Sequence, residues 1–406
     1  MFDVVIVGGG PAGACAGALL ARGSGTGHGL SVALLEPRVP PSPEAAARLP
    51  PDARVVALSR ASERVLRRAG AWQHLPPARV SAYERMHIWH ERVASNSDAV
   101  LSFDAADVAE PNLGYIVENG LLQGALLQAF SEAGGHLEVA SLSSLEFHGA
   151  GVTVGTAGGS LSARLVVGAD GAPSALRAAA GLTATTAAYG QRAIVATVAT
   201  AASHQRSAWQ RFMSRGTLAL LPLSSGESSI VWSADEALAL ELLGKSDEAF
   251  AQALDAASDG VLGRTRLSSA RLSFPLNKLS APRYVLERVA LIGDAAHVVH
   301  PLAGQGVNLG ILDAAALAQQ VLDAVATQED PGALRVLRGY ERWRKSEVAA
   351  MAASIDAFDR LLAHGRGPLA QLAQRGLPWV NRSAEVRRFF IRRALGVSGE
   401  LPRSAR

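Results

Sequence analysis

The sequence predicts an α/β fold in which a dinucleotide-binding unit, built from discontinuous segments, carries an inserted β-sheet unit and a helical C-terminal region. Three observations predict this fold. A strand, a glycine-rich turn and a helix open the chain. Two apolar strands much further along each end in a glycine and an aspartate. The segments between them contain short strands and a hairpin pattern, whereas the last quarter of the chain has the period of helices.

The N-terminal unit is predicted from local patterns. Val4–Val7 is a short apolar run rich in β-branched residues, which is typical of a strand buried on both faces. Small residues then indicate a helix over Pro11–Arg22, and Val32–Leu35 has the pattern of a second parallel strand. Strand, helix and strand together predict a βαβ unit at the start of the chain.

The turn between the first strand and the helix has the pattern Gly8-x-Gly10-x-x-Gly13, with Pro11 and Ala12 inside it. Gly8 allows the tight turn, Gly10 lets the backbone approach a pyrophosphate, and Gly13 lets the helix pack closely on the strand. The helix N-terminus offers free N–H groups to the phosphates. The pattern predicts a Rossmann-like dinucleotide site.

Glu36 follows the second strand directly, where a carboxylate can accept both hydroxyls of an adenosine ribose. An acid at this position disfavours a ribose phosphate, so NADP is not expected in this site. The glycine pattern alone does not separate NAD from FAD.

Two distant segments bear on that choice. Leu165–Gly171 is an apolar strand ending in Gly-Ala-Asp-Gly, which contains Asp170. Leu291–His297 is another strand ending in Gly-Asp, which contains Asp294. A glycine-rich loop follows it, with Pro301, Gly304, Gln305, Gly306, Val307 and Asn308.

With these segments in the order Gly-x-Gly-x-x-Gly, Asp-Gly and Gly-Asp, the chain resembles the para-hydroxybenzoate-hydroxylase-like class of flavoprotein monooxygenases. Asp52–Ser62, Gly114–Asn119 leading to Gln123, and Arg392–Pro402 narrow the likeness. These stretches resemble the ubiquinone-biosynthesis hydroxylases within that class, and the resemblance covers nearly the whole chain.

The resemblance implies that FAD is the bound cofactor. It places Arg54 beside the FAD phosphates, Gln123 near the ribityl chain and Asp170 near the pyrophosphate. Asp294 would bind the ribityl chain. The loop over residues 301–308 would lie against the isoalloxazine ring, with the glycines admitting close backbone approach. Gly120 departs from the family pattern, in which a bulkier residue is common.

The implied activity is hydroxylation of the aromatic ring of a phenol, prenylated if the pathway is that of ubiquinone. NAD(P)H, with NADPH favoured, would reduce the flavin, and O2 would then give a flavin hydroperoxide that transfers one oxygen atom. An isoprenoid double-bond reductase and a non-catalytic flavin-bound subunit of a biosynthetic complex remain as alternatives. The ring position, the oligomeric state and any catalytic base stay open.

The resemblance also suggests how the chain is divided. The FAD-binding domain is expected over 1–76, 102–186 and 278–335, the substrate domain over 77–101 and 187–277, and the C-terminal helical region over 336–406. In the substrate domain, candidates for the wall of the substrate pocket are Leu218, Leu220, Pro222 and Trp232. Ordinary core packing of these four residues is the alternative.

Composition and charge limit the remaining functions. The net charge is +3, and seven arginines against two glutamates lie beyond Asn381. This basic tail is a candidate contact with anionic lipid at the inner membrane or with a partner protein. No nucleic-acid-binding module is evident. His297 and His300 lack a third ligand nearby, so no metal site is expected. The start of the chain lacks a secretory signal, and a cytoplasmic location is expected.

Overall fold

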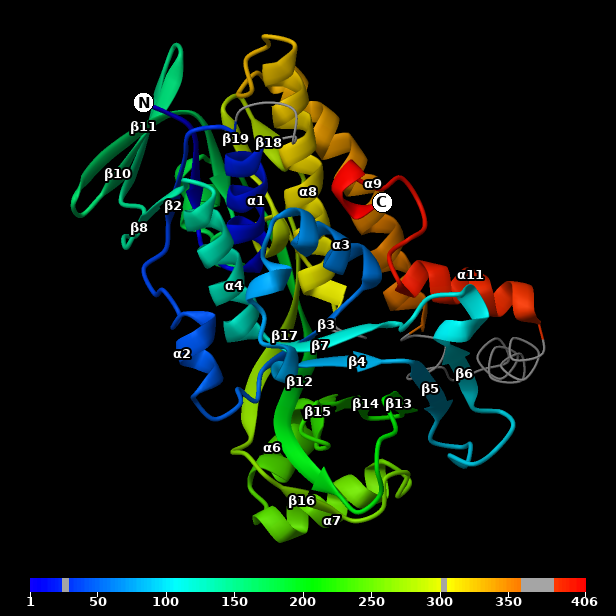
Figure 1. Ribbon diagram of the computed structural model, residues 1–406. Helices are drawn as coiled ribbons and strands as arrows, with labels where there is room; N and C mark the ends of the chain where they lie inside the picture. The colour runs from blue at the N-terminus through cyan, green and yellow to red at the C-terminus, as the bar shows by residue number, and fades with distance from the viewer. Residues whose placement is uncertain (24–28, 301–304, 359–382) are drawn as a thin grey trace.

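The computed structural model describes residues 1–23, 29–300, 305–358 and 383–406. It contains a mainly parallel sheet covered by helices, a large, mainly antiparallel sheet and a small sheet between them, with the last helices along one side (Figure 1). The mixed α/β fold agrees with the prediction.

The first sheet has the strand order β18-β19-β11-β1-β2-β8, with β10 and β9 continuing from β11. Its strands are β1 Phe2–Val7, β2 Val32–Leu35, β8 His136–Glu138, β9 Ser144–His148, β10 Gly151–Thr156, β11 Gly159–Gly168, β18 Val285–Leu286 and β19 Val289–Leu291. The strands β19, β11, β1, β2 and β8 run parallel. In register, Val7 lies beside Leu35 and Gly168, and Gly168 lies beside Leu291. The segments that follow these four strands therefore meet at one edge of the sheet.

The second sheet has the order β20-β17-β12-β15-β14-β13-β5-β6, with β16 beside β12. Its strands are β5 Arg85–His90, β6 Leu101–Asp104, β12 Thr185–Thr200, β13 Ser207–Met213, β14 Gly216–Pro222, β15 Ser228–Asp235, β16 Thr265–Leu267, β17 Leu272–Ser280 and β20 His297–Val298. The third sheet comprises β3 Val55–Leu58, β7 Gly114–Glu118 and β4 Val80–Tyr83. The hairpin pattern of the sequence corresponds to the antiparallel strands β14 and β15, which are joined through Ser224–Gly226.

The helices are α1 Pro11–Arg22, α2 Pro43–Ala47, α3 Arg60–Arg68, α4 Asn119–Glu132, α5 Ala175–Ala179, α6 Glu236–Leu243, α7 Asp247–Ala257, α8 Gln305–Ala326, α9 Leu334–Phe358 and α11 Ala384–Ala394. Short 3-10 turns are η1 Trp72–His74, η2 Pro77–Arg79, η3 Ala105–Val108, η4 Gly293–Ala295 and η7 Arg403–Ala405. The α1 helix has the predicted limits.

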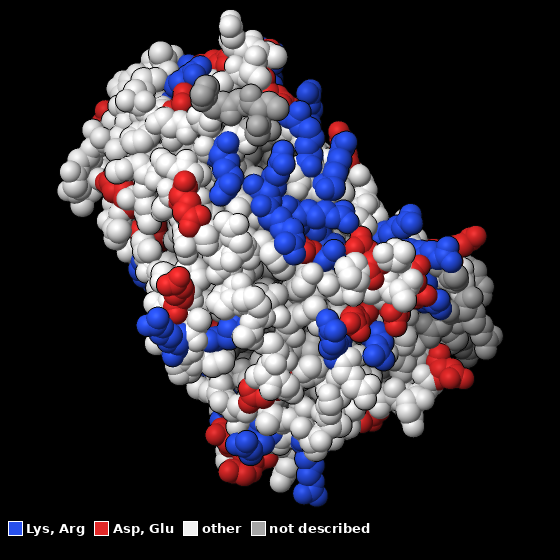
Figure 2. Space-filling view, viewed as in Figure 1, with Lys and Arg blue, Asp and Glu red and all other residues white. Residues whose placement is uncertain are grey.

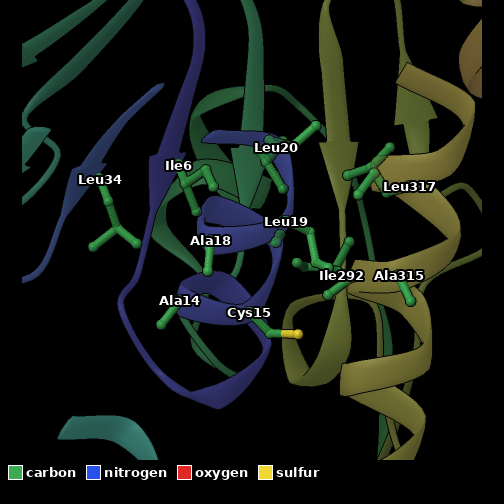
Figure 3. Close-up of a cluster of buried hydrophobic side chains, with 14 of the residues drawn as sticks. Ile6, Ala14, Cys15, Ala18, Leu19, Leu20, Leu34, Ile292, Ala315 and Leu317 are labelled. Atoms are coloured by element: carbon green, nitrogen blue, oxygen red, sulfur yellow. The ribbon is translucent and has the colours of Figure 1, made fainter. Parts of the chain in front are cut away.

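The main core lies where α1 packs on the parallel sheet and against α8. Ile6 and Leu34 from the strands, Leu19 from α1 and Leu317 from α8 belong to this cluster (Figure 3). The stretch Gly306–Ala326 of α8 is long and apolar enough to cross a membrane, with a mean hydropathy of 1.4. However, 67% of its most apolar window is buried inside the protein, so burial in this core accounts for its composition.

The limits of the two predicted domains remain a prediction. The strands β5 and β12–β16 belong to the second sheet, as expected for an inserted unit. However, β12 begins at Thr185 and β17 runs to Ser280, so both cross the predicted limits. β4 lies within the segment expected for the substrate domain, yet it pairs with β7 in the small sheet.

Candidate FAD site

The glycine turn after β1 has the geometry that its sequence pattern requires. Gly8 has a φ of +103°, and a Cβ there would lie 2.4 Å from the carbonyl oxygen of Ala169. A Cβ on Gly13 would lie 2.0 Å from the carbonyl oxygen of Gly8, so only glycine lets α1 pack this closely. A Cβ on Gly10 would meet no atom within 4 Å. Gly8 and Gly13 thus serve close packing, whereas Gly10 borders open space.

That space is a cleft of about 660 Å³ at the carboxyl ends of β1, β2, β11 and β19. Its lining joins segments far apart in the chain, as the register of the parallel strands requires. Predicted site residues in the lining are Gly8, Gly10, Pro11, Ala12, Glu36, Arg54, Gln123, Asp170, Asp294, Gly306 and Val307. Residues that the sequence interpretation missed include Arg38, Asn119, Ser141 and Pro173.

Glu36 closes the cleft at the end of β2. Its carboxylate accepts hydrogen bonds from the N–H of Gly9 at 2.7 Å and from the N–H of Arg38 at 2.9 Å. The side-chain amide of Gln123 donates to the carbonyl oxygen of Gly9 at 3.0 Å. Glu36 and Gln123 therefore hold the glycine turn from two sides while bordering the cleft. One feature of the sequence could have identified Arg38: it follows Glu36, the acid at the end of the second strand, by two residues.

Asp294 sits in the turn after β19 and its side chain is open to the cleft. Desolvation by the surrounding walls raises the pKa of its carboxyl, and the charges of His297 and Arg54 oppose that rise. A carboxylate in such a place gains by accepting hydrogen bonds from a ligand's hydroxyl groups.

Asp170 borders the cleft, but its carboxylate is already engaged. It accepts hydrogen bonds from the hydroxyl of Ser174 at 2.5 Å and from the N–H of Leu176 at 3.0 Å, which orders the start of α5. Arg177 of α5 then donates to the carbonyl oxygen of Ala295 at 2.8 Å. The Asp-Gly segment thereby links α5 to the turn that carries Asp294.

The side chain of Asn308 does not face the cleft. Its oxygen accepts from the N–H of Ser59 at 2.9 Å and the hydroxyl of Ser62 at 2.7 Å, and its nitrogen donates to the carbonyl oxygen of Ala57 at 2.8 Å. These bonds fasten the start of α8 to β3 and α3, so a cofactor contact at Asn308 is left to its backbone. Pro301 and Gly304 lie outside the described residues, as does the side chain of Gln305.

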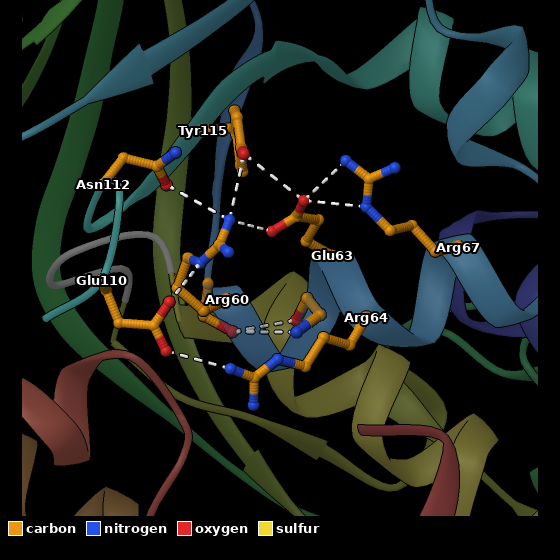
Figure 4. Close-up of polar contacts among 9 residues, drawn as sticks. Arg60, Glu63, Arg64, Arg67, Glu110, Asn112 and Tyr115 are labelled. Carbon is orange, nitrogen blue, oxygen red and sulfur yellow. Dashed lines mark hydrogen bonds and ion pairs between the residues drawn. The ribbon is translucent and has the colours of Figure 1, made fainter. Parts of the chain in front are cut away.

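A partly buried polar network supports α3 next to its contact with Asn308 (Figure 4). Arg60 forms ion pairs with Glu63 and with Glu110, and it donates to the hydroxyl of Tyr115 at 3.0 Å. Glu63 also pairs with Arg67 at 2.9 Å. The network ties α3 to β7 and to the segment before it, and so holds the serines that bind Asn308.

The four residues proposed as a substrate wall lie elsewhere. Leu218, Leu220 and Trp232 pack in the core between the second sheet and α6 and α7, where the Trp232 ring lies 6.0 Å from that of Phe250. Pro222 is buried on the same strand but outside the lining of the cleft. The core-packing alternative therefore describes this face of β14 and β15.

The opposite face of the second sheet is the one that approaches the cleft. Phe274 of β17 pairs with Ala193 of β12, and Ala193 pairs with Ser233, so these three residues share the face away from Trp232. The guanidinium of Arg54, a cleft residue, lies over the Phe274 ring at 5.7 Å.

Comparisons with known proteins agree with this geometry. Residues 1–354 match the FAD binding domain family. Ubiquinone hydroxylase UbiL of Rhodospirillum rubrum is 36% identical over 97% of this chain and 89% of its own length. The 3-demethoxyubiquinol 3-hydroxylase of Escherichia coli K12 is 33% identical over 97% and 98%.

The chain belongs to the FAD-dependent hydroxylase family of ubiquinone biosynthesis. It is an FAD-dependent monooxygenase, and NAD(P)H is the electron donor typical of the family.

Solved structures share the fold. The p-nitrophenol 4-monooxygenase PnpA of Pseudomonas putida DLL-E4 superposes with a TM-score of 0.73 at 19% identity, over 97% of this chain and 98% of that one. Aklavinone-11 hydroxylase, in a ternary complex with FAD and aklavinone, gives 0.67 at 21% identity, over 91% and 70%.

The cleft of this hydroxylase fits FAD on its own geometry. Gly10 leaves room for a pyrophosphate at the N-terminus of α1, whose free N–H groups favour an anion. Glu36 stands at the end of β2, where a ribose would lie. Arg54 offers a positive charge, and Asp294 offers hydrogen-bond acceptors at the far end. When bound, FAD supplies the redox and oxygen-transfer chemistry that no side chain provides.

Proposed function

We propose that this hydroxylase adds a hydroxyl group to the aromatic ring of a prenylated phenol, a precursor of ubiquinone, using NAD(P)H and O2. The observation that carries the proposal is the junction of Arg54 and Phe274. There the cleft that fits FAD meets an exposed aromatic side chain of the second sheet. The printed names of the relatives supply the substrate class.

The face of the second sheet near this junction suits an apolar ring and chain. Leu272 and Phe274 of β17 are two residues apart and on one face, with 38% and 40% of their surfaces exposed. Large apolar side chains left open beside a cleft are typical of a ligand-binding wall. We propose Leu272 and Phe274 as wall residues in place of the four residues buried under α6 and α7.

The protein's own part in the reaction is to bind, orient and exclude water. Glu36 and the glycine turn would hold the adenosine end of FAD, and Asp294 would hold its ribityl chain. The second sheet approaches the cleft where Phe274 meets Arg54, and a substrate held there would be screened from solvent on that side. Because FAD would supply the oxygen-transfer chemistry, the protein needs neither paired carboxylates nor an activated nucleophile.

Quinone extracts of a deletion strain test the proposal. We expect a ubiquinone precursor that lacks one ring hydroxyl group to accumulate, and the position of the missing group names the ring carbon. The wild-type gene should restore ubiquinone, whereas a variant that does not bind FAD should not. A precursor with an unreduced isoprenoid double bond would instead support the reductase alternative. Rescue by the FAD-free variant would support the non-catalytic subunit.

A contact with the membrane would bring the enzyme to a prenylated substrate, and one face of the protein supports it. Figure 2 shows positively charged side chains gathered over α3, α9 and the C-terminal turn. Arg68, Arg338, Arg342 and Arg406 are exposed there, and none has an ion pair within the described ranges. Arg342 and Arg406 also border a groove of about 480 Å³. Arginine forks match phosphate geometry, so this face suits anionic lipid headgroups.

The basic tail is a weaker candidate for that contact. Arg387 of α11 is neutralised by Asp107, with its Nη2 3.0 Å from the carboxylate. Ile391 and Leu395 are buried in a core with α9, so deleting the tail would disturb the fold. Charge reversal at Arg338 and Arg342 is the sharper test. We expect it to abolish flotation with phosphatidylglycerol vesicles, whereas Arg264→Glu on the inserted unit should not. Equal flotation of all three proteins would refute the contact.

A further inference from the structure

Asp313 is a fully buried carboxylate that lies behind the FAD cleft and not in its lining. It sits on α8, has 0% of its surface exposed, and contacts three segments at once. One oxygen accepts from the N–H of Gly293 at 3.0 Å and lies 2.5 Å from Nε2 of His297. The other accepts from Nε of Arg344 on α9 at 2.7 Å.

The contact with Gly293 bears directly on the cofactor site, because Gly293 immediately precedes Asp294. Gly293 has a φ of +57°, and a Cβ there would lie 3.1 Å from Ala12. Ile292, one residue earlier, donates to the carbonyl oxygen of Gly168 at 2.9 Å. Ala295, one residue later, accepts from Arg177. The turn that carries Asp294 is therefore held by hydrogen bonds on both sides. Asp313 binds this turn at Gly293, the residue with the positive φ.

Two other groups, His297 and Arg344, compensate the buried negative charge of Asp313 and orient its carboxylate. Burial alone would raise the pKa of the Asp313 carboxyl, but the charges of His297 and Arg344 and the hydrogen bonds from them hold it below its usual value. The Arg344 side chain is 2% exposed, so the pair is a buried ion pair. Loss of Asp313 alone would leave the Arg344 charge without this counter-charge, and loss of Arg344 alone would leave Asp313 with only His297 beside it.

The same helix makes a second contact with this region. The hydroxyl of Tyr340 donates to the carbonyl oxygen of Leu291, at the end of β19, at 2.8 Å. Tyr340 and Arg344 are four residues apart and lie on one face of α9. The predicted C-terminal helical region thus reaches the strand and the turn that carry Asp294.

We infer that Asp313, oriented by His297 and neutralised by Arg344, is a positioning residue for FAD: it fixes the Gly293–Asp294 turn at which the cofactor is held. The inference depends on FAD binding alone and not on the proposed ring hydroxylation. Loss of FAD affinity and loss of product formation are therefore separate results.

A pair of charge-balanced variants tests it. Asp313→Asn with Arg344→Met removes both buried charges but keeps an oxygen that accepts from Gly293. Asp313→Leu with Arg344→Met removes the charges and the acceptor at similar volume. We expect the leucine variant to bind FAD at least about tenfold more weakly than the asparagine variant. The FAD-free leucine variant should melt at a somewhat lower temperature than the asparagine variant, because the buried N–H of Gly293 loses its acceptor.

The measurements are the dissociation constant by flavin fluorescence titration and the melting temperature by circular dichroism. A merely structural network would lower both melting temperatures and leave the two affinities equal, which would overturn the inference. If the double variants do not fold, His297→Gln and His297→Leu give the same comparison. Glutamine can still donate to Asp313, so only the leucine variant should lose FAD affinity. Equal affinities for these two variants would also overturn the inference.

Discussion

Gly10 caps α1 and Gly13 lies in its first turn three residues later, yet alanine at each should affect a different property. A Cβ at Gly13 would lie 2.0 Å from the carbonyl oxygen of Gly8 and 2.9 Å from the Cβ of Ala169. Backbone cannot yield cheaply, so we expect Gly13→Ala to destabilise the FAD-free protein by about 1–3 kcal/mol. Gly10 has a φ of −62°, which alanine adopts readily, and its Cβ would meet nothing in the protein.

The Cβ of Gly10→Ala would instead project toward the place of the pyrophosphate. Displacing the phosphates by one carbon atom should cost one charge-assisted hydrogen bond, about 1.5–3 kcal/mol. This corresponds to an FAD dissociation constant roughly 10- to 100-fold higher. The melting temperature of the FAD-free protein should be unchanged or slightly raised, because alanine reduces the entropy of the unfolded chain.

The assay compares the wild type and three variants, all FAD-free, by thermal melting and by titration with FAD. Gly149→Ala is the control, since this glycine lies in the turn between β9 and β10 and its Cβ would also meet nothing. It should leave both quantities unchanged. If Gly10→Ala binds FAD as the wild type does, the phosphates do not approach this turn, and the reasoning is refuted.

Three further changes probe other parts of the structure. Glu36→Ala removes the acceptor of the Gly9 N–H and should raise the FAD dissociation constant about tenfold, whereas unchanged affinity would contradict a role at the ribose. Trp232→Ala should destabilise the core under α6 and α7 by about 3–5 kcal/mol in chemical denaturation; a lower affinity for FAD in the folded variant would argue against its placement there. Burial raises the pKa of the Cys15 thiol to about 12, so this cysteine should resist thiol reagents until the protein unfolds. Because the folded pKa exceeds the unfolded one, the thiol's contribution to stability is full below about pH 8.5 and should fall as the pH rises toward 12; a Cys15→Ala variant that loses as much stability over this range would contradict it.

The parts of the fold that sequence patterns predicted depend on neighbours in the chain. The first strand, the glycine turn and the first helix are each determined by residues close together in the sequence, and α1 has the predicted limits. The meeting of Glu36, Asp170 and Asp294 at one cleft follows from parallel strands of matching register, which buried apolar runs indicate.

The features that sequence patterns did not predict depend on contacts between residues far apart in the chain. The bond that turns the Asn308 side chain away from the cleft joins residues 249 positions apart. Asp313 was not identified as a site residue, because its partners come from a turn before α8 and from a later helix. The alternation along β14 defines two faces, but only the later helices α6 and α7 decide which face is the core. That is why Leu218 and Leu220 were plausible wall residues.

The central claim is tested most directly by oxygen labelling. FAD-loaded protein is mixed with NADPH and a prenylated phenol in detergent micelles under ¹⁸O₂, and the product is analysed by mass spectrometry. The account predicts one ¹⁸O atom on the aromatic ring for each product molecule. Oxidation of NADPH with no labelled oxygen in the phenol, in protein that holds FAD, would contradict it.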